Sequence, residues 1–372
     1  MKIESGELTI SGSNTLDVYG DWANSVGNAG FTAEQSTVAF KNSAGISGST
    51  TFNTISNESG NTLTIGTDGY VTVNGNVENA GTLTGVANST LEMAGTNDAV
   101  LAAGTYNLAN LKINKTAGSV AANSEIKVDG EFAIFGGILS MNNHTLVLGS
   151  NATTSYDNNN TTAYVDGEMS KTGTTSIVFP IGNNNRRAMV GIEPNNANAS
   201  TRFTAGYTYV PKDPNAEPTT PDPMDAGMVR VSKMDNWQIS GSNGTSAYVT
   251  LYWDDGDISE ITKLEYLTIA HWNGSKWEML PATATGNPKS GQIRTSAPVS
   301  SFSPFTFGST EVTENPLPVE ISDFTGRQDG NVVVLEWTTL SEKDNDFFEI
   351  ERSTDGINFA TIGFVQGAGN SA

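Results

Sequence analysis

The first 150 residues repeat one short pattern, in which a polar residue alternates with an apolar one. An alternation with a period of two residues is typical of strands that bury a single face. Dipeptides that favour turns, such as Asp68-Gly69, Asn74-Gly75 and Asp129-Gly130, separate these segments. The apolar positions predicted to form the interior are Leu8, Ile10, Leu16, Val18, Leu63, Ile65, Val71, Val73, Leu91, Met93, Leu111, Ile113, Ile126, Val128, Leu146 and Leu148.

Repeated strands that cannot bury a face alone are expected to stack on one another as a solenoid. We therefore predict an all-β protein in which residues 1–155 form a β-solenoid stalk similar to a right-handed parallel β-helix. The segments are irregularly spaced, which leaves an antiparallel β-sandwich as the alternative for this region. No segment here shows the 3.6-residue period of an amphipathic helix.

Beyond residue 155 the strand-like segments become longer and richer in large side chains. We predict a β-sandwich domain over residues 156–310, with the Pro-rich stretch 211–223 as a loop inserted into it. Residues 311–318 are predicted to be a linker. Four further strands are predicted over residues 319–372, at 319–324, 332–337, 347–352 and 359–363.

The charge and composition exclude several classes of partner and site. Forty Asp and Glu against 19 Lys and Arg give a net charge of −21. Nucleic-acid binding requires clustered Lys and Arg that neutralise phosphates, so no nucleic-acid partner is expected. No run of 18 apolar residues occurs, so membrane insertion is not expected either. The chain has no cysteine, which excludes disulfides and thiolate metal sites.

The densest group of carboxylates is a candidate calcium site. Asp254, Asp255 and Asp257 follow a strand-like segment, and hard carboxylate oxygens of this kind are ligands for Ca²⁺. The competing interpretation is a solvated hairpin turn after Trp253. The loop of residues 157–160, one Asp and three Asn, is a weaker candidate for the same ion. No cofactor other than Ca²⁺ is predicted.

Histidine chemistry and catalysis have little support in the sequence. His144 and His271 each lack a second histidine nearby, so we expect no histidine-based metal site. Polysaccharide lyases on parallel β-helices use a basic residue beside acidic calcium ligands, but no Arg precedes Arg186. We therefore predict no catalytic residues. The aromatic residues available to stack on sugars, most of them expected in the core, are Tyr156, Tyr207, Tyr209, Trp237 and Trp272.

Three motifs stand within about 55 residues at the C-terminal end: 317–320 (LPVE), 335–339 (LEWTT) and 348–359 (FEIERSTDGINF). Through these motifs this end of the chain resembles a fibronectin type III-like module of secreted Bacteroidetes proteins. In those proteins the module usually stands before the C-terminal sorting domain that the type IX secretion system reads. The middle region carries the motifs 164–167 (YVDG), 179–182 (FPIG) and 271–277 (HWNGSKW). Through them it is similar to the domain that commonly precedes this module, although Arg187-Ala188 stands where that family tends to have Arg-Pro.

The resemblance implies export to the cell surface or the medium. A complete type III sandwich has about seven strands, whereas four are predicted here. The chain also contains neither a signal peptide nor a sorting domain, so we expect it to be a fragment of a longer protein. The strand edges of a partial sandwich are expected to pair with another chain or to be disordered.

From these observations we predict a secreted or cell-surface structural or adhesive protein, a non-enzymatic scaffold exported by type IX secretion. Its expected partners are polysaccharide or extracellular matrix. One alternative is a carbohydrate-binding or polysaccharide-degrading β-helix protein. The other is a subunit of a filament or matrix that self-associates through its C-terminal strand edges.

Overall fold

A computed structural model of the protein describes residues 1–210, 223–254, 259–302, 304–311, 314–315, 321–330, 332–339, 342–353 and 359–371. The predicted all-β class, with a solenoid region, is confirmed. The only helical segments in the described part of the chain are two 3₁₀ turns, η1 (Asn28–Gly30) and η2 (Leu264–Tyr266).

The chain divides into two compact units. The first comprises Met1–Tyr209, Trp237–Asp255 and Ala297–Pro304. The second comprises Val210–Asn236, Gly256–Ser296 and Phe305–Ala372. The first unit thus holds the predicted solenoid together with part of the region predicted as a sandwich.

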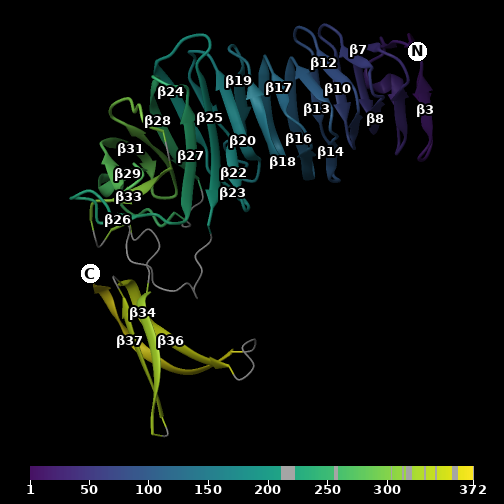
Figure 1. The fold of residues 1–372 in the computed structure, drawn as a ribbon. Coiled ribbons are helices and arrows are strands. Elements are labelled where there is room, and N and C mark those ends of the chain that lie inside the picture. Colours follow the sequence, from purple (N-terminus) through teal and green to yellow (C-terminus); the bar gives the residue numbers. More distant parts are fainter. Residues whose placement is uncertain are drawn as a thin grey trace. The chain divides into compact units, whose positions relative to one another are not determined.

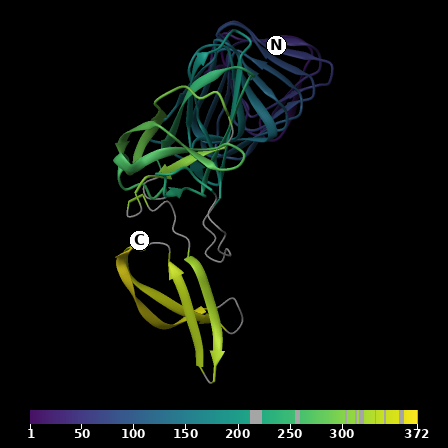
Figure 2. The same ribbon diagram turned by 60° about the vertical axis from the view of Figure 1, so that its left-hand side comes forward.

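A parallel β-solenoid of about eight turns forms most of the first unit, and its coils follow one another in chain order in Figures 1 and 2. Its strands lie in three parallel stacks, which we call A, B and C. Stack A contains β1 (Lys2–Ile3), β4 (Trp22–Asn24), β7 (Ala44–Phe52), β9 (Thr62–Ile65), β12 (Thr82–Gly85), β15 (Thr105–Leu108), β17 (Ile126–Val128), β18 (Glu131–Leu148) and β20 (Tyr164–Thr172).

The longest strands belong to more than one stack, because a long strand turns a corner and enters the next stack. Stack B contains β3 (Thr15–Val18), β6 (Thr37–Phe40), β8 (Thr54–Asn57), β11 (Val77–Asn79), β14 (Ala99–Leu101), β16 (Asn110–Ala122), parts of β18 and β20, and β22 (Ile181–Asn183). Stack C contains part of β7, β10 (Tyr70–Val73), β13 (Thr90–Met93), parts of β16 and β18, and β19 (Thr153–Tyr156). A separate parallel pair joins β2 (Leu8–Thr9) to β5 (Phe31–Thr32).

The coils differ in length, which explains the irregular spacing in the sequence. Thr37 pairs with Thr54, 17 residues further on, whereas Ile138 pairs with Tyr164, 26 residues further on. The difference in coil length lies at the corners between the strands. Every strand pairing described within residues 1–155 is parallel, so the antiparallel sandwich considered for this region is wrong. Parallel pairing continues past residue 155, where Val165 pairs with Ile181.

Apolar side chains fill the interior in register from coil to coil. Leu91 pairs with Leu111, which pairs with Phe132, and all three side chains are fully buried. All the predicted interior positions are buried except Leu8, Ile10 and Leu16, which are half-buried. These three lie in the first coil.

Asparagines also lie inside the solenoid, at the edge of stack B. The side-chain amide of Asn57 donates to the Asn79 side-chain oxygen at 2.8 Å and to the Thr82 carbonyl at 3.1 Å. One coil later the Asn79 amide donates to the Thr105 carbonyl at 3.0 Å. Both residues are buried, so the amides satisfy backbone oxygens that a turn would otherwise leave unpaired.

Antiparallel strands follow the last coil of the first unit. β20 pairs antiparallel with β25 (Arg202–Tyr209), and β22 pairs with β23 (Arg186–Arg187). β25 is joined in turn to β27 (Asp235–Gly241). A separate antiparallel sheet contains β21 (Ile177–Phe179), β24 (Val190–Asn196) and β28 (Ser246–Trp253).

The strand pairs described within the second unit are antiparallel. β29 (Leu267–Trp272) lies between β30 (Trp277–Leu280) and β33 (Phe305–Ser309), and β33 also pairs with β26 (Arg230–Val231). Three hairpins complete it: β31 (Ala282–Asn287) with β32 (Ser290–Thr295), β34 (Ile321–Asp329) with β35 (Val332–Thr339), and β36 (Glu342–Ser353) with β37 (Phe359–Ser371).

The last two hairpins contain the described residues of all four strands predicted for the C-terminal end. The Trp337 ring on β35 packs against Phe348 on β36, with ring centres 5.4 Å apart. Large apolar side chains on these hairpins are exposed: Phe324, Val332, Val333, Phe359, Ile362, Phe364 and Val365. The segment 317–320 of the fibronectin type III-like resemblance lies outside the described residues.

Glycine sets one of the corners of the solenoid. At Gly48, β7 leaves stack A, with a φ of +78°. A β-carbon at this position would lie 2.0 Å from the Asn24 carbonyl oxygen on the preceding coil. Gly60 has nearly the same φ, +83°, but a β-carbon there would meet no atom within 4 Å.

Replacing these two glycines with alanine separates the cost of backbone strain from the cost of a close contact with the adjacent coil. Gly60→Ala should lose about 1 kcal/mol of stability, because only the left-handed backbone conformation is strained. Gly48→Ala should lose at least about 2 kcal/mol more, because the adjacent coil must also move. Urea unfolding followed by circular dichroism measures both. Equal losses would mean that the contact with Asn24 does not constrain the corner.

Candidate functional site

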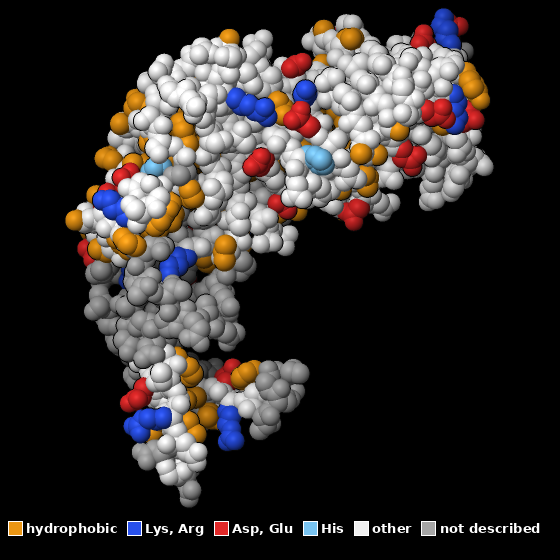
Figure 3. Space-filling model, in the orientation of Figure 1, with side chains coloured by type: hydrophobic (Ala, Val, Ile, Leu, Met, Phe, Trp, Pro, Cys, Tyr) orange, Lys and Arg blue, Asp and Glu red, His pale blue; other side chains and the backbone are white. Residues whose placement is uncertain are grey.

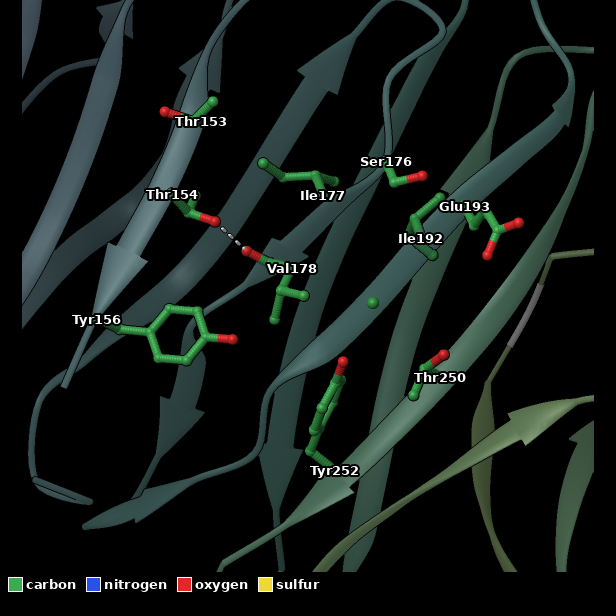
Figure 4. A pocket seen from close by; sticks show the side chains of 11 residues that line it. Thr153, Thr154, Tyr156, Ser176, Ile177, Val178, Ile192, Glu193, Thr250 and Tyr252 are labelled. Atoms are coloured by element: carbon green, nitrogen blue, oxygen red, sulfur yellow. Dashed lines mark hydrogen bonds between the residues drawn. The ribbon is translucent and has the colours of Figure 1, made fainter. Parts of the chain in front are cut away.

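An open groove with a volume of about 370 Å³ lies in the first unit, between β19 and the sheet of β21, β24 and β28 (Figure 4). Two tyrosines, Tyr156 and Tyr252, point into it from opposite walls. Thr154 and Thr250 also line it, and the Thr154 hydroxyl donates to the Val178 carbonyl at 2.7 Å. The groove therefore combines aromatic faces with hydroxyl groups.

Strand alternation places Tyr252 in the groove. Leu251 and Trp253 are buried on one face of β28, so Thr250 and Tyr252 lie on the other face. Gly191 on β24 leaves room for them, since a β-carbon there would lie 3.2 Å from Thr250 and 3.5 Å from the Tyr252 ring.

Both tyrosines remain protonated at neutral pH. Burial raises the pKa of Tyr156, and the nearby charge of Arg187 only partly opposes this effect. Burial also raises the pKa of Tyr252, with a smaller contribution from Tyr156. Each hydroxyl can therefore both donate and accept a hydrogen bond.

A buried arginine fixes the chain segments that follow the two tyrosines. The Arg187 Nε and Nη2 atoms donate to one Asp254 carboxylate oxygen, at 2.8 Å and 2.5 Å. Nη1 donates to the carbonyls of Asp157 and Asn160, at 2.7 Å and 3.0 Å, and Nη2 donates to that of Asn158 at 3.1 Å. These bonds engage all five N–H groups of the guanidinium.

The structure gives a definite role to one residue of the predicted calcium site. The Asp254 carboxylate is bound by Arg187, whereas Asp255 and Asp257 lie outside the described residues. The carbonyls of the weaker candidate loop, residues 157–160, also meet this guanidinium. Among the described residues, no group of three or more His, Asp or Glu side chains gathers as metal ligands. Calcium binding at Asp254, Asp255 and Asp257 stays a prediction.

The candidate sugar-stacking aromatics lie in different surroundings. Tyr156 lines the groove, whereas Tyr207 and Trp237 are buried against each other with ring centres 5.2 Å apart. Tyr209 lies under the Arg186 guanidinium, 4.9 Å away, and Trp272 packs against the Trp277 ring at 5.4 Å. Sequence reasoning missed Tyr252, although the alternation in β28 indicates that it faces away from the core.

A second polar cluster lies on the outer side of stack C. Glu92 accepts hydrogen bonds from the Tyr70 hydroxyl at 2.9 Å and the Asn114 amide at 2.8 Å, and pairs with Lys112 at 3.1 Å. Burial alone would raise the pKa of Glu92, but these partners lower it overall. Because they come from three successive coils, we interpret the cluster as a clamp between coils.

His271 lies buried in the second unit, against the Phe305 ring at 4.7 Å. Its Nδ1 lies 3.6 Å from the Glu278 carboxylate. Burial lowers the pKa of His271 below its usual 6.5, and the attraction of Glu278 only partly opposes this. His144, the other histidine, is exposed on β18.

Comparisons with protein-family models, with curated proteins and with solved structures found no match. Within the described chain, no helix has the length and apolarity needed to cross a membrane.

Replacing Arg187 tests whether it fixes the groove walls. Arg187→Met keeps much of the side-chain volume but leaves the Asp254 carboxylate and three carbonyls without these donors, so it should cost about 3–5 kcal/mol of stability. Urea unfolding of the purified protein measures the loss. Arg202→Met is the matched control, because Arg202 is exposed and donates from its side chain to the Ser170 hydroxyl at 2.7 Å. A loss at Arg187 no larger than that at Arg202 would contradict this role.

Burial of His271 predicts a pH-dependent stability. As pH falls through about 6.5, the unfolded chain takes up a proton at this histidine, whereas the folded chain resists doing so. The stability contribution is therefore fully present above pH 6.5 and is lost as pH falls toward the lower folded pKa.

Urea midpoints at pH 7.5 and 5.5 measure this effect. His271→Gln should show a smaller decrease than the unmodified protein, and the control His144→Gln should show the same decrease. An unchanged pH dependence in His271→Gln would refute the assignment.

Proposed function

We propose that this chain is a non-enzymatic structural and adhesive protein of the cell surface or medium, exported by the type IX secretion system. The observation that carries the proposal is the continuous solenoid. Adjacent strands in a sheet lie about 4.8 Å apart, so eight coils make a rod roughly 40 Å long. Bending such a rod would disturb hydrogen bonds in three stacks at once, which suits a rigid spacer.

The surface chemistry is consistent with a spacer that is soluble outside the cell. On the face drawn in Figure 3, acidic and basic side chains of the solenoid lie in small scattered groups rather than in one patch. The net charge of −21 disfavours adsorption to anionic surfaces. Export by type IX secretion is supported by the C-terminal resemblance alone.

Retention and cleavage of polysaccharides can be measured in one experiment. The chain is immobilised on beads and incubated, with and without Ca²⁺, with a panel of acidic and neutral extracellular polysaccharides. We expect at least one polysaccharide to be retained, and mass spectrometry to detect no released oligosaccharide. Released oligosaccharide would refute the non-enzymatic role, and a panel from which nothing is retained would contradict the adhesive role.

Self-association is a second candidate function. The exposed apolar side chains on β34, β35 and β37 favour contact with a second copy of the chain, because their burial would release water. Sedimentation velocity over a range of concentrations tests it. A single monomeric species at every concentration would exclude it.

A further inference from the structure

We infer that the groove between β19 and the sheet of β21, β24 and β28 binds an uncharged saccharide chain, which contacts Tyr156 and Tyr252. The inference rests on the proposed adhesive function, because it names the class of ligand and the place where it binds. The first argument is the composition of the walls. A sugar ring has apolar C–H faces and a rim of hydroxyls, and tyrosine offers both an aromatic face and a hydroxyl partner.

The groove places these groups where a ligand can reach them. Tyr156 and Tyr252 are half-buried, so each keeps part of its ring exposed. Val178, which is half-buried, adds an apolar surface between the hydroxyl-bearing side chains of Thr154 and Thr250. Because the groove is open rather than enclosed, a chain longer than one sugar unit can lie along it.

The charge of the groove selects against acidic sugars. Glu193 is the one carboxylate among the residues that line it, no Lys or Arg lines it, and the chain as a whole carries −21. A uronate or sulfated sugar would meet like charge without a basic residue of the lining to offset it. An uncharged chain of neutral sugars avoids this repulsion.

Arg187 acts as a positioning residue for both tyrosines. It binds the carbonyl of Asp157, which follows Tyr156 in the chain, and the carboxylate of Asp254, two residues after Tyr252. The two walls are therefore joined through one buried guanidinium. A groove held in place before binding loses less conformational freedom when a ligand enters.

Affinity electrophoresis of the whole chain tests the inference. Native gels contain a neutral polysaccharide (a β-glucan, a xylan or a mannan) or an acidic one (alginate or polygalacturonate). We expect retardation by at least one neutral polymer, and a dissociation constant at least tenfold higher for Tyr156→Ala and for Tyr252→Ala. Tyr19→Ala is the matched control, since Tyr19 is 70% exposed on the first coil, outside the groove, and should bind as the unmodified protein does.

Phenylalanine variants and circular dichroism distinguish a lost contact from a lost fold. Tyr156→Phe and Tyr252→Phe retain the ring and should bind more tightly than the alanine variants, and circular dichroism confirms that each variant is folded. Unchanged retardation of the folded double alanine variant would overturn the groove as the site while leaving the adhesive function in place. Preference for alginate or polygalacturonate would overturn the ligand class, and no retardation by any neutral polymer would overturn the inference itself.

Discussion

The pairing of each coil with the next is the interaction on which the first unit depends. A single coil contains three short strands and cannot bury its apolar face alone. Stacking places side chains such as Leu91, Leu111 and Phe132 in register and removes them from water. The same stacking leaves no room at some corners, which is why Gly48 lies so close to the carbonyl of Asn24. Hydrophobic burial and backbone geometry thus constrain one another along the whole rod.

The groove arises where this regular pairing ends. β20 pairs with parallel strands on its solenoid side but antiparallel with β25, and the sheet of β21, β24 and β28 follows. β19, the last strand of stack C, consequently faces strands that belong to a different sheet. An open space of about 370 Å³ remains between them.

The Arg187 guanidinium, a fixed cation within the protein, binds the oxygens beside the groove. Asp254 and the loop of residues 157–160 both suggest calcium when only the sequence is considered. In the structure their oxygens surround the Arg187 guanidinium, whose five N–H groups satisfy them directionally. This arrangement joins segments about 30 and 67 residues away from Arg187 along the chain.

The sequence by itself determined the all-β class, the solenoid and part of its interior, because alternation with a period of two residues reports which face of a strand is buried. It did not single out interior side chains such as Trp22, Phe52 and Phe132, which are fully buried. It could not determine the corners or the coil lengths, since Gly48 and Gly60 look alike until a neighbouring coil is present. Nor could it bring Tyr156 and Tyr252 together or pair Arg187 with Asp254. Those contacts join residues far apart in the chain, and only tertiary packing decides which distant segments become neighbours.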